Sequence, residues 1–185
     1  LGAVLLIVLS GNLPMLILGF IATGVGLRAL LLFYAERPEA RRAAAKFTLV
    51  WGAGDVALIL AALLIWGAFG VVDYAGLSAA LQAESSLPLT AQIAVALLVL
   101  AAALKTASFP LHGWLTEVME APTPVSALLH AGIINSGGFL LIRMSEMVQA
   151  SPGAMAALVM LGGITALFGA VVMLTQSAIK TALAW

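Results

Sequence analysis

Lys105 is the most costly residue for this chain to place, because it closes the apolar run Thr90–Leu104. A lysine ammonium at bilayer depth costs about 2.5 to 3.5 kcal/mol on insertion scales, and is kept mainly where it pairs, relays protons or binds an ion. The next segment, Thr106–Trp114, carries Pro110, which breaks or kinks a helix. Transporters build ion sites from such broken helices. A lysine beside a helix break therefore indicates a transport function.

A histidine lies at a depth similar to that of the lysine. Lys105 is about 22 Å along a helix that starts at Thr90, and His130 is about 9 Å along a helix that starts at Pro124. Because these helices are antiparallel neighbours and histidine titrates near neutral pH, the two residues are candidates for a proton relay. The alternatives are a lysine that snorkels to the interface and a histidine that bonds a carbonyl. His112 is a weaker candidate for the same pathway, and its position fits either the broken segment or the membrane interface.

Asp55 is the second intramembrane charge, inside the helix expected at Phe47–Phe69. An aspartate at this depth is a functional candidate by default. The alternative is a structural carboxylate that pairs with Arg28 or Lys46 near the end of the helix.

The remaining charged groups favour structural roles. Glu117 and Glu120 are three residues apart and predict an interfacial polar face rather than a proton port. Arg143 and Glu146 predict a local pair at the surface. A zinc site from the two histidines would need a third well-spaced ligand, which the sequence does not offer.

The composition defines the class of protein. Hydrophobic residues make up 63% of the 185 residues and charged residues 9%, which is too apolar for a domain whose exterior faces water. The apolar runs are continuous rather than alternating, so helices are expected rather than a barrel. The absence of cysteine excludes disulfides and thiolate-held clusters within these residues. Eight scattered basic residues make no surface for nucleic acid, and no cofactor is expected.

The elements that position these residues are membrane spans. Hydropathy predicts apolar helices at Leu1–Leu9, Leu13–Tyr34, Phe47–Phe69, Thr90–Ala107, Pro124–Met147 and Pro152–Thr175, with a last helix from near Ser177. We expect an all-α, polytopic transmembrane bundle with a proline-broken helix. Residues 1–185 would form one transmembrane domain, and both ends fall within apolar runs, so we expect the middle of a longer protein.

Basic residues predict the orientation of the bundle. The loop Ala35–Lys46 carries four of them and is expected in the cytoplasm, whereas Gly70–Leu89 has none and is expected outside. Pro110–Ala121 and Lys180 would then be cytoplasmic, and Val148–Ser151 external.

Local signals refine two of the helices. Thr123-Pro124 and Ser151-Pro152 each predict a hydroxyl N-cap followed by proline in the first position of a helix. Gly132, Gly137 and Gly138 form a small-residue face that allows close helix packing or leaves space for water.

The stretch Lys105–Arg143 resembles the central motif of the antiporter-like membrane subunits. These include the proton-pumping subunits of complex I, the large subunits of Mrp-type sodium/proton antiporters, and the DabB subunits of inorganic carbon transporters. The resemblance is carried by KTASFPLHGWL and PTPVSALLHAG, which contain Pro110, Pro122 and Pro124. Weaker agreement at Gly24–Tyr34, Gly54–Val56 and Gln176–Trp185 extends it over nearly the whole chain.

The resemblance implies roles for individual residues. Lys105 matches the family's lysine at a helix break, and His130 matches a histidine in a hydrated proton path. In complex I and Mrp relatives a glutamate modulates this lysine, but Thr23 stands at its position here. The arginine that usually precedes the GDV aspartate is also absent, with Gly52 near its place.

Features at Ala22–Arg37 and His130–Arg143 favour the DabB subfamily. This resemblance implies a proton- or sodium-translocating subunit for inorganic carbon (CO₂ or bicarbonate) uptake in the cell inner membrane, with a soluble zinc-containing partner and no active site of its own. The alternatives are subunit L of NADH:quinone oxidoreductase, with the other membrane subunits of complex I as partners, and an Mrp-type Na⁺/H⁺ antiporter subunit.

Overall fold

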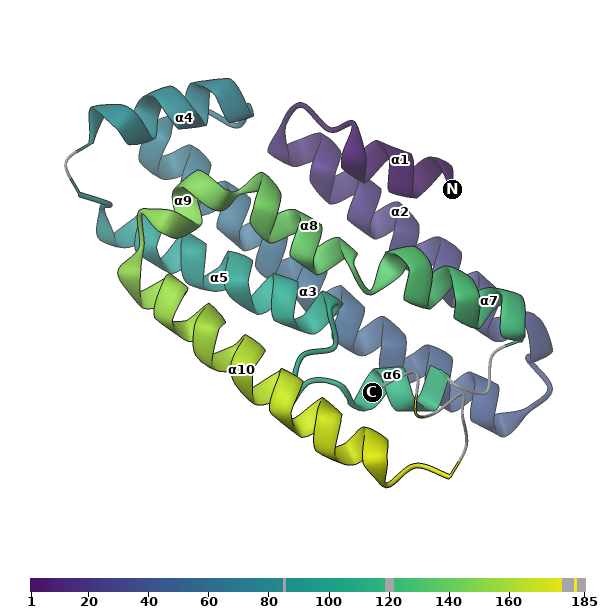
Figure 1. The fold of residues 1–185 in the computed structure, drawn as a ribbon. Helices are drawn as coiled ribbons and strands as arrows, with labels where there is room; N and C mark the ends of the chain where they lie inside the picture. Colours follow the sequence, from purple (N-terminus) through teal and green to yellow (C-terminus); the bar gives the residue numbers. More distant parts are fainter. Residues whose placement is uncertain (85, 119–121, 178–181, 183–185) are drawn as a thin grey trace.

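The computed structural model describes residues 1–84, 86–118, 122–177 and 182, and its elements are helices, as expected. Among these residues, three helices are long and apolar enough to cross a membrane. They are α2 (Leu13–Leu31, continued by a 3₁₀ turn to Tyr34), α3 (Pro38–Phe69) and α10 (Pro152–Leu174). A shorter apolar helix, α5 (Leu89–Lys105), runs alongside α3 in the same bundle (Figure 1).

Short helices join and cover these long ones. The chain begins with α1 (Gly2–Val8), and α4 (Tyr74–Ala83) follows α3 within the region expected to be a loop. After α5 come α6 (Gly113–Glu117), α7 (Thr123–Leu128), a π-helical turn (Leu129–Ile133), α8 (Ser136–Arg143) and α9 (Ser145–Gln149).

The core forms where α3 packs against α5, with α2 on α3 and α8 on α5. The contact between α8 and α5 depends on Gly137, as the small-residue face predicted. A β-carbon at this position would lie 2.5 Å from the carbonyl oxygen of Ala102 and 2.7 Å from Cγ2 of Thr106. Gly132 and Gly138 have no such neighbours, so only part of the predicted face is packed.

Helix α3 is longer than the predicted Phe47–Phe69. It begins at Pro38 and contains 32 residues, which corresponds to a length of about 48 Å. Proline is favoured at the first helical position, and the alanines that follow are strong helix formers, so the basic segment folds as helix rather than loop. Since the hydrocarbon core of a bilayer is about 30 Å thick, the first turns of α3 extend beyond it.

The break after Lys105 is present, but it does not start at Pro110. Helix α5 ends at Lys105, and Ala107 then adopts a left-handed conformation with φ 54°. The amide of Ser108 donates to the carbonyl of Ala103 at 3.1 Å, which is the long hydrogen bond of a Schellman motif. Pro110 lies in the turns that follow. The helix is therefore ended by a C-terminal cap rather than by the proline.

The span predicted at Pro124–Met147 is divided into several pieces. The π-helical turn holds His130, and the amide of Ile134 donates to the carbonyl of Leu129, five residues earlier. A continuous helix was expected because this stretch is apolar throughout, and hydropathy does not register a change in hydrogen-bond spacing. Such π-helical turns occur frequently at functional sites.

The two predicted N-caps have different outcomes. Ser151 caps α10 by accepting a hydrogen bond from the amide of Ala154, as expected. Thr123 instead lies inside α7, whose N-cap is Pro122, so Pro124 is in the first turn but not at its first position. The backbone of Pro122 is extended (ψ 145°), which starts the helix one residue early.

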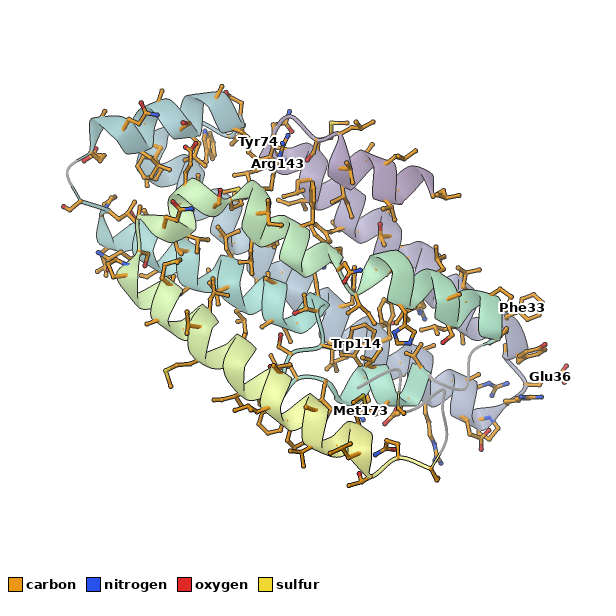
Figure 2. The ribbon with its side chains drawn as sticks, viewed as in Figure 1. Phe33, Glu36, Tyr74, Trp114, Arg143 and Met173 are labelled. Atoms are coloured by element: carbon orange, nitrogen blue, oxygen red, sulfur yellow. The ribbon has the colours of Figure 1, made fainter. Side chains whose placement is uncertain are left out.

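Side-chain contacts identify which segments share an end of the bundle. Lys46 forms an ion pair with Glu117, so the basic turns of α3 lie beside α6. At the other end Arg143 donates to the carbonyl of Ser10 at 2.5 Å and lies 4.4 Å from the centre of the Tyr74 ring. Figure 2 shows Arg143 and Tyr74 together, far from Phe33 and Glu36.

These contacts correct one predicted pair. Arg143 was expected to pair with Glu146, but the ion pairs among the described residues do not include it. The backbone carbonyl of Ser10 and the face of Tyr74 are its partners instead. Glu120, Lys180 and most of the predicted last helix lie outside the described residues.

Candidate functional site

Lys105 lies at the centre of the candidate site, at the last turn of α5. Its side chain is fully buried, and its Nζ donates to Oδ1 of Asp55 on α3 at 2.6 Å. The aliphatic stem of the lysine lies against Gly54, where a β-carbon would be 3.4 Å from Cγ and Cε. The interfacial, snorkelling alternative is therefore wrong for Lys105. The side chain turns inward to meet a carboxylate, as a buried ammonium requires.

Two aromatic rings complete the surroundings of the ammonium. Its Nζ lies 4.1 Å from the centre of the Trp51 ring and 4.6 Å from that of Phe20. The electron-rich face of an aromatic ring attracts a cation, most strongly where water is excluded. Lys105 is thus held by one carboxylate and two ring faces, which come from α3 and α2.

A glycine fixes the position of Trp51. The indole Nε1 donates to the carbonyl of Phe20 at 3.2 Å. A β-carbon at Gly24 would lie 2.5 Å from Cδ1 of this indole, so a larger residue on α2 would displace the ring. The packing of α2 on α3 therefore determines where the face of Trp51 lies relative to Lys105.

Asp55 pairs with neither of the two partners, Arg28 and Lys46, that the sequence offered as alternatives. Lys46 pairs with Glu117, and Lys105 is the cation bonded to Asp55. Arg28 lines the same small cavity as Asp55, without an ion pair to it among the contacts of the described residues. Hydropathy predicts which helix carries each charged residue. It does not predict how each helix is rotated about its own axis, and this rotation decides which charged residues meet.

The broken segment is anchored to the same core. Trp114 of α6 is buried, and its Nε1 donates to the carbonyl of Leu104 at 3.2 Å. Its ring packs edge-on against Phe47 and Trp51, with centres 5.4 and 6.4 Å away. This tryptophan uses a carbonyl near the end of α5 and holds α6 close to the Lys105–Asp55 pair.

The two histidines line a separate cavity of about 310 Å³ at the break itself, where Thr106, Ala107 and Phe109 also line it. His112 stacks on Phe109 with ring centres 5.6 Å apart, and it also lies 5.6 Å from the ring centre of Phe168. His130 reaches the cavity from the π-helical turn. The amide of Phe109 donates to the hydroxyl of Thr165, which attaches the broken segment to α10. We call this space the histidine cavity.

The structure thus divides the four predicted residues into two pairs. Lys105 and Asp55 are bonded to each other, while His112 and His130 line one cavity. Thr106, the residue that follows α5, lines this cavity. Its hydroxyl lies 2.9 Å from that of Ser108. A relay from Lys105 toward His130 remains a hypothesis, and Thr106 is the described residue that adjoins both regions.

Sequence reasoning overlooked Trp51 and Phe20. Trp51 precedes Asp55 by four residues, which places both on one face of α3. That spacing was a usable signal, whereas nothing in the sequence pointed to Phe20. Among the described residues, no three histidine or acidic side chains gather closely enough to hold a metal ion.

The comparisons with known proteins agree on one family. The family model described as "NADH:quinone oxidoreductase/Mrp antiporter, TM" matches residues 10–185. The chain is 47% identical over 184 residues to "Probable inorganic carbon transporter subunit DabB2" of Halothiobacillus neapolitanus, covering 100% of this chain and 33% of the relative. It is 39% identical over 187 residues to NADH-quinone oxidoreductase subunit L of Mycobacterium tuberculosis, covering 100% and 29%.

Solved structures share the fold. A chain in the structure of the Mrp complex from Dietzia sp. matches with a TM-score of 0.90 and 30% identity, over 98% of this chain and 20% of that one. The expected antiporter-like architecture is therefore confirmed. The chain spans about a third of the length of the curated inorganic carbon transporter subunits that it matches.

Proposed function

Because the chain belongs to the family of transmembrane subunits of NADH:quinone oxidoreductase and Mrp antiporters, we propose that it moves protons or sodium ions across a membrane for inorganic carbon uptake. The proposal takes its substrate from the relatives whose printed names are inorganic carbon transporter subunits, at 47% and 40% identity. The residues 1–185 would act as one transmembrane domain.

The observation that carries this proposal is the ion pair of Lys105 and Asp55 beside a helix break. A buried charge pair is at best weakly stabilising, so stability alone does not explain its presence. The pair would hold a proton or exchange it for a cation, while the histidine cavity would receive the proton at the break. Lys105 and Asp55 would be the ion-carrying residues, and His130 and His112 would extend the path.

Partners and orientation follow as further parts of the proposal. The protein would lie in the cell inner membrane, with the segment 35–46 in the cytoplasm. A soluble zinc-containing subunit would handle CO₂ or bicarbonate, as the resemblance to DabB implies. The similarity to a chain of the solved Mrp complex supports contacts with other membrane subunits.

A second candidate function is the proton-pumping subunit L of NADH:quinone oxidoreductase. It is favoured by the 39% identity to such a subunit from Mycobacterium tuberculosis. The two functions differ in their driving reaction. Membranes that contain the full protein would couple ion movement to NADH oxidation only in the second case, and to uptake of labelled bicarbonate only in the first.

Substitution of Lys105 by arginine tests the role of the pair. Arginine keeps the positive charge opposite Asp55, but it does not release a proton at physiological pH. We expect the Lys105→Arg variant of the full protein to reach the membrane in normal amounts and to lose ion-coupled carbon uptake. The measurement is uptake of labelled inorganic carbon by cells that depend on this transporter.

Two further variants make the test decisive. Asp55→Asn should also abolish uptake, whereas Lys46→Gln, which removes the partly exposed pair with Glu117, should leave uptake near normal. Normal uptake by Lys105→Arg protein would contradict a proton-carrying role for this lysine.

A further inference from the structure

A small cavity of about 130 Å³ lies between α2 and α3, away from the histidine cavity. Its polar lining residues are Arg28, Thr48 and Asp55, and Gly52 and Trp51 form part of its wall. We call it the α2–α3 groove. Asp55 lines this groove, whereas Thr106, Ala107 and Phe109 of the break line the histidine cavity, and the two spaces share no described lining residue.

The groove follows the axis of α3. Thr48, Gly52 and Asp55 lie on one face of this helix, and the seven residues from Thr48 to Asp55 correspond to about 10 Å. Thr48 is nearer to the basic first turns of α3, and Arg28 lies near the end of α2 that leads to them. The groove therefore extends inward from the end of the bundle that carries Lys46 and Glu117.

Asp55 is the member of the pair that faces this groove. Its Oδ1 accepts the hydrogen bond from Lys105, and its side chain keeps 15% of its surface exposed. Lys105 itself is fully buried and does not line the groove among the described residues. Any water that approaches the pair from this side meets the carboxylate first.

We propose that the α2–α3 groove is a hydrated passage through which protons reach Asp55, and through it Lys105. An ordered water needs two to four polar partners. The Asp55 carboxylate and the Thr48 hydroxyl, which itself donates to the carbonyl of Ala44, can accept from water in this groove, and the exposed Arg28 guanidinium can donate to it. A proton taken up by the carboxylate breaks its charged contact with Lys105 and leaves the ammonium free to release its own proton toward the break. The inference rests on the proposed function, because it gives the Lys105–Asp55 pair an entrance.

Gly52 keeps this passage open. A β-carbon at position 52 would have no atom within 4 Å, so a larger side chain fits there without a clash and fills the groove. Gly67, on the same helix, also has open space at its β-carbon but lies outside the groove. The two glycines form a matched pair, because replacement by leucine raises the helix propensity equally at both.

Thiol labelling tests hydration without any need for transport. Single cysteines replace Thr48 or Gly52 in a cysteine-free form of the full protein in native membranes. Leu49 and Val56 are the controls, since these residues of α3 are 73% and 56% exposed but do not line the groove. A charged methanethiosulfonate reagent modifies thiolates, which form in water and not in lipid or packed protein.

We expect cysteines at positions 48 and 52 to react roughly tenfold or more faster than those at 49 and 56, because only hydrated thiols ionise readily. Equal rates at all four positions, or faster reaction at the control positions, would overturn the hydrated groove.

Transport provides the second arm. Gly52→Leu should reduce ion-coupled uptake by roughly tenfold or more, as a blocked proton path does, while Gly67→Leu should leave uptake unchanged. The Gly52→Leu protein should reach the membrane in normal amounts and keep its unfolding midpoint in detergent, which shows that it is folded. Normal uptake by Gly52→Leu overturns the passage, whereas normal uptake by Lys105→Arg overturns the proton-carrying role proposed for Lys105.

Discussion

At the scale of single residues, the main finding is how the ammonium of Lys105 is stabilised. The resemblance to complex I and Mrp subunits implies a glutamate, one helix pair before the lysine, at the position where this chain has Thr23. Thr23 is buried, and its hydroxyl has no hydrogen-bond partner among the described residues. The rings of Trp51 and Phe20 stand beside the ammonium, together with the single carboxylate of Asp55. Aromatic faces therefore contribute part of the stabilisation that a second carboxylate would give.

Fluorinated tryptophan at position 51 tests this contribution. Each fluorine withdraws electron density from the ring face with little change of shape, so attraction to the ammonium weakens stepwise. A desolvated cation–π contact is worth about 2 kcal/mol. From unmodified tryptophan to the most fluorinated form, we therefore expect the free energy of unfolding to fall by a comparable amount. Thermal unfolding of the purified full protein gives the measurement.

Trp114 is the matched control for this series. It is buried in the same aromatic cluster, but the cation contacts of the described residues do not include it. The same fluorinated residues at position 114 should change stability little. A similar loss at both positions would show that fluorine acts through packing and not through the ammonium.

At the scale of helices, the sequence predicted the apolar spans better than their interruptions. Leu13–Tyr34 agrees with α2 and the 3₁₀ turn that continues it, and Pro152–Thr175 agrees with α10 to within a residue, because hydropathy directly reports which segments avoid water. The break after Lys105 was assigned to Pro110, whereas backbone capping at Ala107 ends the helix. A left-handed alanine carries no sequence signal, because glycine is the usual residue there.

The Ala107→Gly substitution tests the cap. An L-residue pays a conformational cost in the left-handed region that glycine does not. We expect Ala107→Gly to stabilise the full protein by about 1 kcal/mol, since the native φ of 54° suits glycine. The unfolding midpoint in detergent should rise accordingly, and Ala107→Val should lower it, because β-branched residues tolerate this conformation worst. A lower midpoint for Ala107→Gly would contradict a strained cap.

At the scale of the whole molecule, charge placement and side-chain contacts agree on the two ends of the bundle. The ion pair of Lys46 with Glu117 joins two segments that the basic residues predict on one side of the membrane. Arg143 joins the turn at Ser10 to α4 at the far end. Residue spacing predicted this grouping, because each span reverses the direction of the chain. The pairing of Lys105 with Asp55 required the structure, since it depends on helix rotation within the bundle.

The orientation of the bundle leads to a final prediction. Glu36, labelled in Figure 2, precedes the basic turns of α3. Glu84 directly follows α4, which lies at the opposite end of the bundle (Figure 1). The excess of Arg and Lys near residue 36 predicts that this end faces the cytoplasm. With single cysteines at these positions of the full protein, an impermeant thiol reagent should label position 84 in intact cells and position 36 only in inverted vesicles. Labelling of both positions from one side would contradict the fold, and the reverse pattern would contradict the orientation alone.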